Sequence, residues 1–247
     1  TSSLTITSDL LENSGSATNA TIDDLRADTT SAVNLTLASS DTDVVKVIVN
    51  DLSADKASTV TVTSSEKVTF TDIDAADDAT LDFSGVTAEL NVTPDTSNDY
   101  TIKGSASAKT ILAMGVGMDA DDVVSAGTNT GDEISFTANG QTATTGKLNI
   151  TGFEKINVLS TTASTIDATS ISGGTIRVFG DGAGGGDSSA NMTITNLAAN
   201  STIGVGSNLS SGVNDTYGTS GSAVTLTASL ADATGSSDAI TFDIGQT

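Results

Sequence analysis

The chain has 247 residues, with 31 acidic and 9 basic side chains, a formal net charge of -22 and no Cys, His or Trp. Enzymes and metal sites that depend on a thiolate or an imidazole are therefore excluded, as are disulfide frameworks. The seven Lys and two Arg residues are scattered along the chain, so no surface for nucleic acid or anionic lipid is predicted, and the expected partner is a cation.

The apolar residues indicate an ordered chain, although their fraction is only 36%. Low hydrophobicity with a high net charge is typical of disorder, but here the apolar residues recur in regular short runs and Pro94 is the single proline. The longest runs, at residues 44–49 and 111–114, are too short to span a bilayer. The sequence has no initiating Met and no secretory leader, so we expect a piece of a longer protein.

Apolar and polar residues alternate with a period of two, which predicts short strands with one apolar face and one hydroxyl-rich face. Turn residues separate these strands at intervals of roughly 10 to 13 residues. The pattern predicts an all-β fold with strands at residues 4–7, 33–37, 60–63, 68–71, 90–93, 134–137, 148–151, 156–158, 176–178, 192–195, 224–227 and 240–242.

Two architectures fit many short strands, a parallel β-helix (β-solenoid) and a tandem β-sandwich. Residues 66–70 and the strands that follow them resemble residues 154–158 and theirs, at offsets of 88 and 85, and residues 131–136 resemble 237–242 at an offset of 106. If these offsets are four and five turns of a coil, each turn has about 21 to 22 residues, which favours the solenoid. We expect one solenoid over residues 1–247, with a break or an insertion at the less strand-like residues 104–130.

The glycine-rich segment at residues 180–187 is the most distinctive local motif. Glycines permit positive φ angles, so backbone carbonyls and Asp oxygens could converge on a hard cation such as calcium. Asp181, Gly185 and Asp187 are the candidate calcium-site residues. The segment is similar to the calcium-binding nonapeptide of RTX proteins, although Ala183 and Ser189 depart from it. A solvated flexible turn is the alternative.

Pairs of carboxylates also lie at predicted strand ends. Adjacent carboxylates repel and raise one another's pKa, and a bound divalent ion relieves this repulsion. Asp outnumbers Glu by 26 to 5, and short Asp side chains suit ion binding in turns, although Asp is common in solvated turns as well. The predicted calcium ligands of this kind are Asp77, Asp78, Asp121, Asp122, Asp132 and Asp238.

Catalysis is not predicted. Paired carboxylates can cleave glycosides, and some parallel β-helices act on polysaccharides. A lyase for uronic acids, however, needs basic residues to bind the substrate carboxylate, and this chain offers only Arg26, Arg177 and dispersed Lys. Its eight Phe and Tyr residues are also too few to predict a sugar-stacking surface. A carbohydrate-active enzyme is therefore the least favoured reading.

Residues 150–158 (Ile-Thr-Gly-Phe-Glu-Lys-Ile-Asn-Val), followed by Thr-Ile-Asp-Ala-Thr-Ser at 165–170, resemble the repeats of surface-layer (S-layer) proteins of Gram-negative bacteria and of related RTX-type secreted surface proteins. A second copy of this phrase lies at residues 66–84. The resemblance implies a right-handed parallel β-helix, calcium-dependent assembly into a surface lattice, and export by a type I system. The chain departs from these families by lacking tandem nonapeptides and a recognisable secretion tail.

The predicted function is a calcium-stabilised structural segment of an extracellular bacterial surface layer, which assembles with copies of itself. Anchoring to cell-surface glycan and export would then belong to parts of the polypeptide that are not present here. The alternative is a stalk or ligand-binding module of a large secreted RTX-type adhesin.

Overall fold

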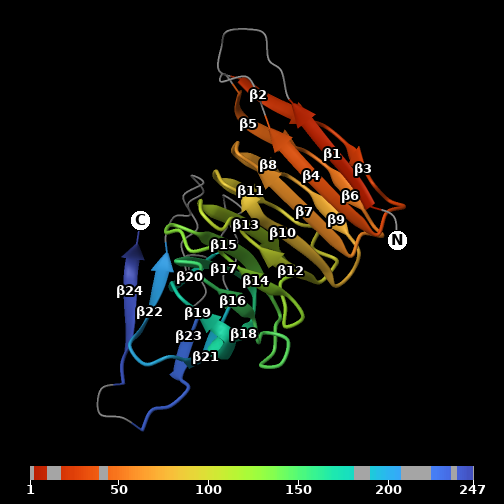
Figure 1. The fold of residues 1–247 in the computed structure, drawn as a ribbon. Coiled ribbons are helices and arrows are strands. Elements are labelled where there is room, and N and C mark those ends of the chain that lie inside the picture. Colours follow the sequence, from red (N-terminus) through yellow and green to blue (C-terminus); the bar gives the residue numbers. More distant parts are fainter. Residues whose placement is uncertain are drawn as a thin grey trace. The chain divides into compact units, whose positions relative to one another are not determined.

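In the computed structural model the chain consists almost entirely of short β-strands (Figure 1). The structure describes residues 3–9, 18–38, 44–180, 190–206, 224–234 and 238–246. Within these ranges the one helical element is a 3-10 turn, Ala168–Ser170. Contacts divide the chain into two compact units, the first with Thr1–Gly117 and Val123–Glu133 and the second with Met118–Asp122 and Ile134–Thr247.

The first unit contains three runs of hydrogen-bonded parallel strands. The first run is β1 (Ser3–Asp9), β4 (Ala32–Ala38), β7 (Thr59–Ser64), β10 (Ala79–Val86), β12 (Tyr100–Lys103) and β14 (Val123–Ser125). The second is β2 (Thr18–Ile22), β5 (Val44–Val49), β8 (Val68–Phe70), β11 (Leu90–Val92) and β13 (Thr110–Gly115). The third is β3 (Leu25–Arg26), β6 (Leu52–Ala54) and β9 (Ile73–Ala75).

The second unit also contains three runs of strands. One is β15 (Glu133–Asn139), β17 (Lys155–Thr162), β20 (Thr175–Phe179), β22 (Ser201–Gly206) and β24 (Ile240–Gln246), of which only Glu133 belongs to the first unit. Another is β18 (Ser164–Asp167), β21 (Met192–Leu197) and β23 (Leu226–Leu230), and the shortest is β16 (Asn149–Thr151) with β19 (Ile171–Ser172).

Strands that are neighbours in a sheet lie about one coil turn apart in the sequence. Val60 pairs with Leu81 and Leu81 with Ile102, each 21 residues further along the chain. The step lengthens to 27 residues between Val33 and Val60. The period of 21 to 22 residues that the repeats predict is therefore the step from one strand to its sheet neighbour.

The repeated phrase of the sequence corresponds to this turn. In the first copy, strand β11 pairs with β8, so Leu90 lies beside Val68. In the second copy, β20 pairs with β17, so Ile176 lies beside Ile156. Each copy therefore begins on one strand and returns, one turn later, to the strand that stacks next to it.

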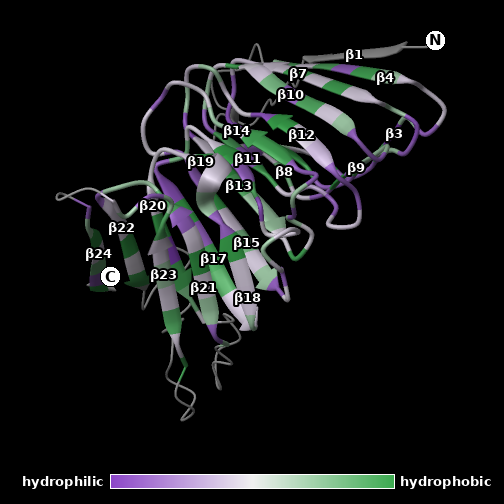
Figure 2. Ribbon diagram, turned by 90° about the horizontal axis from the view of Figure 1, so that it is seen from below, coloured by the Kyte–Doolittle hydropathy of each residue, from purple (hydrophilic) through white to green (hydrophobic). Residues whose placement is uncertain are grey.

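The alternation of apolar and polar residues separates a buried face from a solvent face (Figure 2). In β4 and β7, every second residue is buried. Stacking in register places buried aliphatic side chains directly next to one another, as in the row Val33, Val60, Leu81, Ile102 and Val124. Such rows bury apolar area without large aromatic residues, which explains how a chain with 3% aromatic residues forms a core.

The predicted all-β fold is confirmed, with the long parallel sheets of a β-solenoid. All the strand pairs whose register is described are parallel, so the antiparallel sandwich alternative is wrong. Parallel neighbours require a long connection between them, and the 21-residue turn provides it. Among the described residues, the structure contains no apolar helix that is long enough to cross a membrane.

Residues 104–130, where the sequence predicts a break or an insertion, form strands in part. The apolar stretch at 111–115 lies in β13, where Leu112 and Met114 are buried. Strand β13 ends at Gly115, whose φ of 60° is in the left-handed region. The boundary between the two compact units also falls within residues 104–130.

Candidate cation-binding site

Aspartates line the strand ends of the three-stranded run β3, β6 and β9 in the first unit. Asp24, Asp51 and Asp72 each immediately precede one of these strands. Leu25 pairs with Leu52 and Leu52 with Ile73, so the three aspartates occupy equivalent positions in successive turns. Because strands in a sheet lie about 4.8 Å apart, stacking of the turns produces a column of carboxylates.

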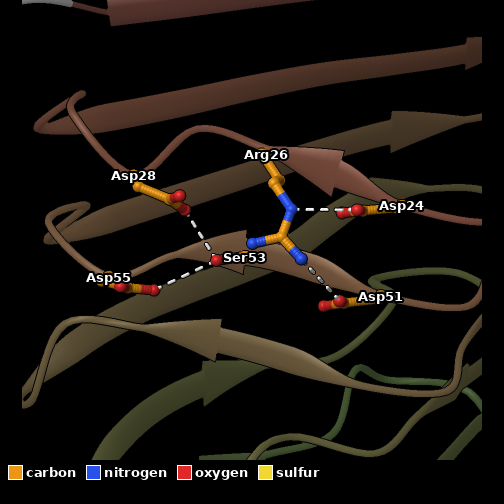
Figure 3. A network of polar contacts seen from close by, with 6 residues as sticks. All are labelled: Asp24, Arg26, Asp28, Asp51, Ser53 and Asp55. Atoms are coloured by element: carbon orange, nitrogen blue, oxygen red, sulfur yellow. Dashed lines mark hydrogen bonds and ion pairs between the residues drawn. The ribbon is translucent and has the colours of Figure 1, made fainter.

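Arg26 is the base that faces this column (Figure 3). Its Nε lies 2.9 Å from Oδ2 of Asp24, and its Nη2 lies 3.9 Å from Oδ2 of Asp51. The hydrogen bond with Asp24, and then the charge of Asp24, raise the pKa of Arg26. Ser53 lies between Asp28 and Asp55, with its hydroxyl 2.6 Å from Asp28 Oδ1 and 3.2 Å from Asp55 Oδ1. One guanidinium therefore faces several carboxylates.

The column continues beyond Arg26 to Asp72, Asp74 and Asp95. Desolvation, followed by the charges of Asp95 and Asp51, raises the pKa of Asp72. Desolvation, followed by the charges of Asp55 and Asp95, likewise raises the pKa of Asp74. The folded chain thus holds these carboxylates close enough to disfavour their ionised forms, which is the situation that a bound cation relieves.

A second series of aspartates follows the same strands. Asp55, Asp77 and Asp99 are spaced by 22 residues, and the backbone N–H of Asp99 donates to Oδ1 of Asp77 over 3.1 Å. Asp77 and Asp78, both predicted calcium ligands, are exposed in the turn before β10. The φ of Asp78 is 61°, a turn conformation that Asp tolerates better than most residues. The structure therefore places Asp77 in a series of turns and not in an isolated pair.

Asp121 and Asp122 lie in a short loop of the second unit together with Asp119. The N–H of Asp119 donates to Asp122 Oδ2 over 3.0 Å, and the N–H of Asp121 donates to Asp119 Oδ1 over 2.9 Å. A carboxylate oxygen of Asp119 lies within 4.8 Å of one of Asp122. Asp122 is buried and Asp121 is exposed. Of the predicted pair, Asp122 is thus the residue that faces a second carboxylate.

Asp132 and Asp238, which occupy matching positions in the sequence repeat, differ in their surroundings. Asp132 is fully buried, and its Oδ1 accepts a hydrogen bond of 2.6 Å from the backbone N–H of Thr110. This contact holds the first residue of β13. Asp238 is half-buried and lies two residues before β24. Asp181, Gly185 and Asp187 lie outside the described residues.

Sequence reasoning missed Asp51, Asp55, Asp95 and Asp99, because none of them has an acidic neighbour within two residues. The signal that reveals them is their spacing. Asp51 and Asp72 are 21 residues apart, and Asp77 and Asp99 are 22 apart, which is the step of the coil. Aspartates in phase with the turn length become spatial neighbours even when they are isolated in the sequence.

The second unit carries a polar hollow of about 380 Å³. Asn157 pairs with Arg177, Arg177 with Gly204 and Gly204 with Asp243, so these four residues form one row across the strands. Gly204 interrupts the row of side chains, and a Cβ there would lie 3.0 Å from Cγ of Arg177. The guanidinium of Arg177 lies 5.1 Å from the ring centroid of Phe179. The hollow is lined by Glu154, Lys155, Thr175, Arg177, Thr202, Gly204 and Asp243.

Comparisons with protein-family models, with curated proteins and with solved structures found no match for this chain. The functional argument therefore rests on the chemistry of the chain's own residues.

Proposed function

We propose that this chain is a structural segment of an extracellular bacterial surface layer, and that calcium stabilises it. The observation that carries this proposal is the column of aspartates at the ends of β3, β6 and β9, where carboxylates stack in phase with the coil. Stacked parallel turns form extended, repetitive surfaces, a property of structural proteins. The resemblance of residues 150–170 to surface-layer repeats supports the same proposal.

Calcium suits the oxygen donors of this column. A calcium ion takes six to eight oxygen ligands from carboxylates, backbone carbonyls and water, in a flexible geometry. Asp72 and Asp74 have raised pKa values because of desolvation and their neighbouring carboxylates, so a divalent ion there would remove an existing repulsion. Asp51 and Asp95 lie close enough to contribute to it. The Asp119–Asp122 loop of the second unit is the next candidate.

Thermal unfolding with calcium and with EGTA tests the calcium proposal. A ligand that binds only the folded state raises its stability, so EGTA should lower the melting temperature and calcium should restore it. Magnesium at the same concentration and ionic strength is the control, because it demands a more rigid octahedral site. An identical melting curve with calcium and with EGTA would contradict the proposal. Electron microscopy of calcium-loaded protein then asks whether two-dimensional arrays form.

The alternative function is a ligand-binding module of a large secreted adhesin. The hollow around Arg177 favours it, because two of the nine basic residues of the chain, Lys155 and Arg177, gather there beside Thr175 and Thr202. Titration with acidic and neutral glycans distinguishes the two functions. Binding that the Arg177→Ala change abolishes, in a protein that stays monomeric with calcium, would favour the adhesin.

We propose a structural and not a catalytic role for the acidic residues. Catalysis of glycoside cleavage needs two carboxylates with opposite environments, one that keeps its proton and one that stays ionised. Desolvation and like charges raise the pKa of both Asp72 and Asp74, so their environments do not separate an acid from a base. Turnover of a polyuronide or glycan that is lost on changing either residue would contradict this role.

A further inference from the structure

Two rows of core side chains in the second unit run to the end strand β24 and become exposed there. The even-numbered residues of β24 continue the buried face of β22, since Ile203 pairs with Phe242 and Val205 with Ile244. The first row is Ile156, Ile176, Ile203 and Phe242, and the second is Val158, Val178, Val205 and Ile244.

Burial changes abruptly along these rows. Ile156 and Ile203 are 0% exposed, whereas Phe242 is 44% and Ile244 is 79% exposed. No strand among the described residues pairs with the outer edge of β24, which is the last strand of its run in Figure 1. An edge that combines free backbone groups with exposed apolar side chains is a template for a further strand. Solenoids usually cover such an end, because an open core is costly.

The rows specify the strand that fits this edge. It must run parallel to β24 and carry two small or aliphatic side chains, two residues apart, on the face of Phe242 and Ile244. Strand β2 of the first unit has this pattern, because Ala20 pairs with buried Val47 and Ile22 with buried Val49. Ala20 and Ile22 are themselves half-buried, and β2 is the first strand of its own run.

Side-chain volume and charge both favour this match. With Phe242 next to Ala20 and Ile244 next to Ile22, the largest of the four side chains meets the smallest. Strand β2 carries no charged residue, so Asp243 of β24 would lie next to the hydroxyl of Thr21 and not next to a second carboxylate. In a chain of net charge -22, most other surfaces would place acids against acids.

We infer that β24 of one copy pairs in parallel with β2 of a second copy, so that copies join head to tail. This inference deepens the proposed function, on which its biological meaning rests, because it names a surface through which copies assemble. The interface uses two different surfaces of the chain. Such heterologous contacts leave a free β2 at one end and a free β24 at the other, and therefore propagate into open filaments.

Sedimentation of the 247-residue chain over a series of concentrations tests the inference. The wild-type mass should rise with concentration, and Ile244→Lys should return it to the mass of one chain, because a lysine would be buried in the joint. The control is Thr241→Lys, which adds the same charge to the opposite face of β24 and should leave assembly intact. Far-UV circular dichroism checks that each variant is folded. A wild-type chain that stays monomeric at every concentration would overturn the inference.

Mixing two blocked variants tests the direction of assembly. Ile22→Lys blocks β2 and leaves β24 free, whereas Ile244→Lys does the reverse. Each variant alone should be monomeric, and their mixture should form one-to-one dimers that do not grow further. Dimers of Ile22→Lys by itself would overturn the head-to-tail arrangement, because they would require β24 to pair with β24. Thr21→Lys is the control for Ile22→Lys and should assemble at least as well as the wild type.

Cross-linking gives a second measurement that does not depend on disrupting the joint. The chain has no Cys, so Thr21→Cys with Asp243→Cys introduces the only two thiols. In the proposed register these residues are neighbours on adjacent strands, and oxidation should give a ladder of disulfide-linked oligomers. Thr21→Cys with Ser229→Cys, out of register, should give no ladder. Equal ladders from both pairs would overturn the register.

The inference and the proposed function can fail separately. A melting curve that ignores calcium, together with loss of assembly in Ile244→Lys, would remove the calcium proposal and keep the joint. Calcium-dependent arrays that form equally well from Ile244→Lys would keep the proposed function and overturn the joint.

Discussion

The rings of Phe70 and Phe83 meet in the core of the first unit, with centroids 5.5 Å apart and planes inclined by 52°. Phe70 belongs to β8 and Phe83 to β10, which lie in different runs of strands. Both side chains are 0% exposed. A tilted aromatic pair adds about 1 kcal/mol to the area that it buries, so this contact joins two sheet faces across the thin core.

Replacing Phe83 with Ala should destabilise the first unit strongly. Loss of a buried Phe leaves a cavity and typically costs about 3 to 5 kcal/mol. Chemical denaturation measures the loss. Phe242→Ala is the matched control and should cost much less, because Phe242 is 44% exposed. Equal losses for the two variants would contradict the assigned core.

Asp72→Asn should make the calcium-free protein more stable at neutral pH. Desolvation and the charges of Asp95 and Asp51 raise the pKa of Asp72, so the folded state binds a proton more readily than the unfolded chain. The resulting penalty is present above the raised pKa and disappears as the pH falls towards the ordinary value near 3.8. We expect a gain of about 0.5 kcal/mol at pH 7, since exposed charges interact weakly, and no gain at pH 3.

Calcium should reverse the effect of this substitution. If Asp72 contributes to a calcium site, Asp72→Asn loses part of the rise in melting temperature that calcium gives the wild type. Glu66→Gln is the control, because it removes one charge of the first unit away from the column. A calcium-induced rise that is the same in all three proteins would exclude Asp72 as a ligand.

Asp167→Ala should destabilise the second unit at neutral pH. Asp167 Oδ1 accepts hydrogen bonds from the N–H and hydroxyl of Thr169 and from Nδ2 of Asn196, at 2.6 to 2.9 Å. Burial by itself would raise the pKa of Asp167, but these hydrogen bonds outweigh it and lower the pKa. The stabilisation is therefore present above the unfolded pKa and is lost as the pH falls through the lowered folded pKa. We expect a loss of about 1 to 2 kcal/mol at pH 7, measured by denaturation at several pH values.

The chain offers a matched control for this change. Asp232 makes the same two hydrogen bonds, to the N–H and hydroxyl of Thr234, but no residue corresponding to Asn196 is seen to donate to it. Asp232→Ala should therefore cost less than Asp167→Ala. A larger loss for Asp232→Ala would show that the contact with Asn196 contributes little.

Gly174→Ala should destabilise the link between β19 and β20. The φ of Gly174 is 57°, and a Cβ there would lie 2.2 Å from the backbone oxygen of Phe153. Left-handed strain costs about 1 to 2 kcal/mol, and the clash with backbone adds to it, so we expect a loss of about 3 kcal/mol in denaturation. Gly131→Ala separates the two effects, because Gly131 has a φ of 93° but no atom within 4 Å of a built Cβ. Equal losses for both variants would rule out the clash.

The strand pattern could be read from the sequence because alternation is a local property. Each of the twelve ranges expected from alternation overlaps a strand of the structure, including residues 33–37 in β4 and 156–158 in β17. Strands of two or three residues, such as Leu25–Arg26 and Ile73–Ala75, were missed because they are too short to alternate visibly. Pairing with stacked neighbours, and not their own sequence, makes these residues strands.

The acidic sites could be read only in part. Adjacent carboxylates such as Asp77 and Asp78 stand out in the sequence, whereas Asp51 and Asp95 become neighbours of Asp72 only when the turns stack. Asp132 illustrates the converse. It lies next to Glu133 in the sequence, yet the structure buries it to hold the N–H of Thr110.

The sequence by itself determined the excess of 22 negative charges, the absence of thiolate and imidazole chemistry, and the alternation that gives an all-β fold. These properties depend on composition and on residues one or two positions apart. The tertiary structure decided which acids meet and which apolar rows stay open, such as the row that ends at Phe242. Both depend on the register between strands 20 or more residues apart, which parallel hydrogen bonding fixes only once the chain has coiled.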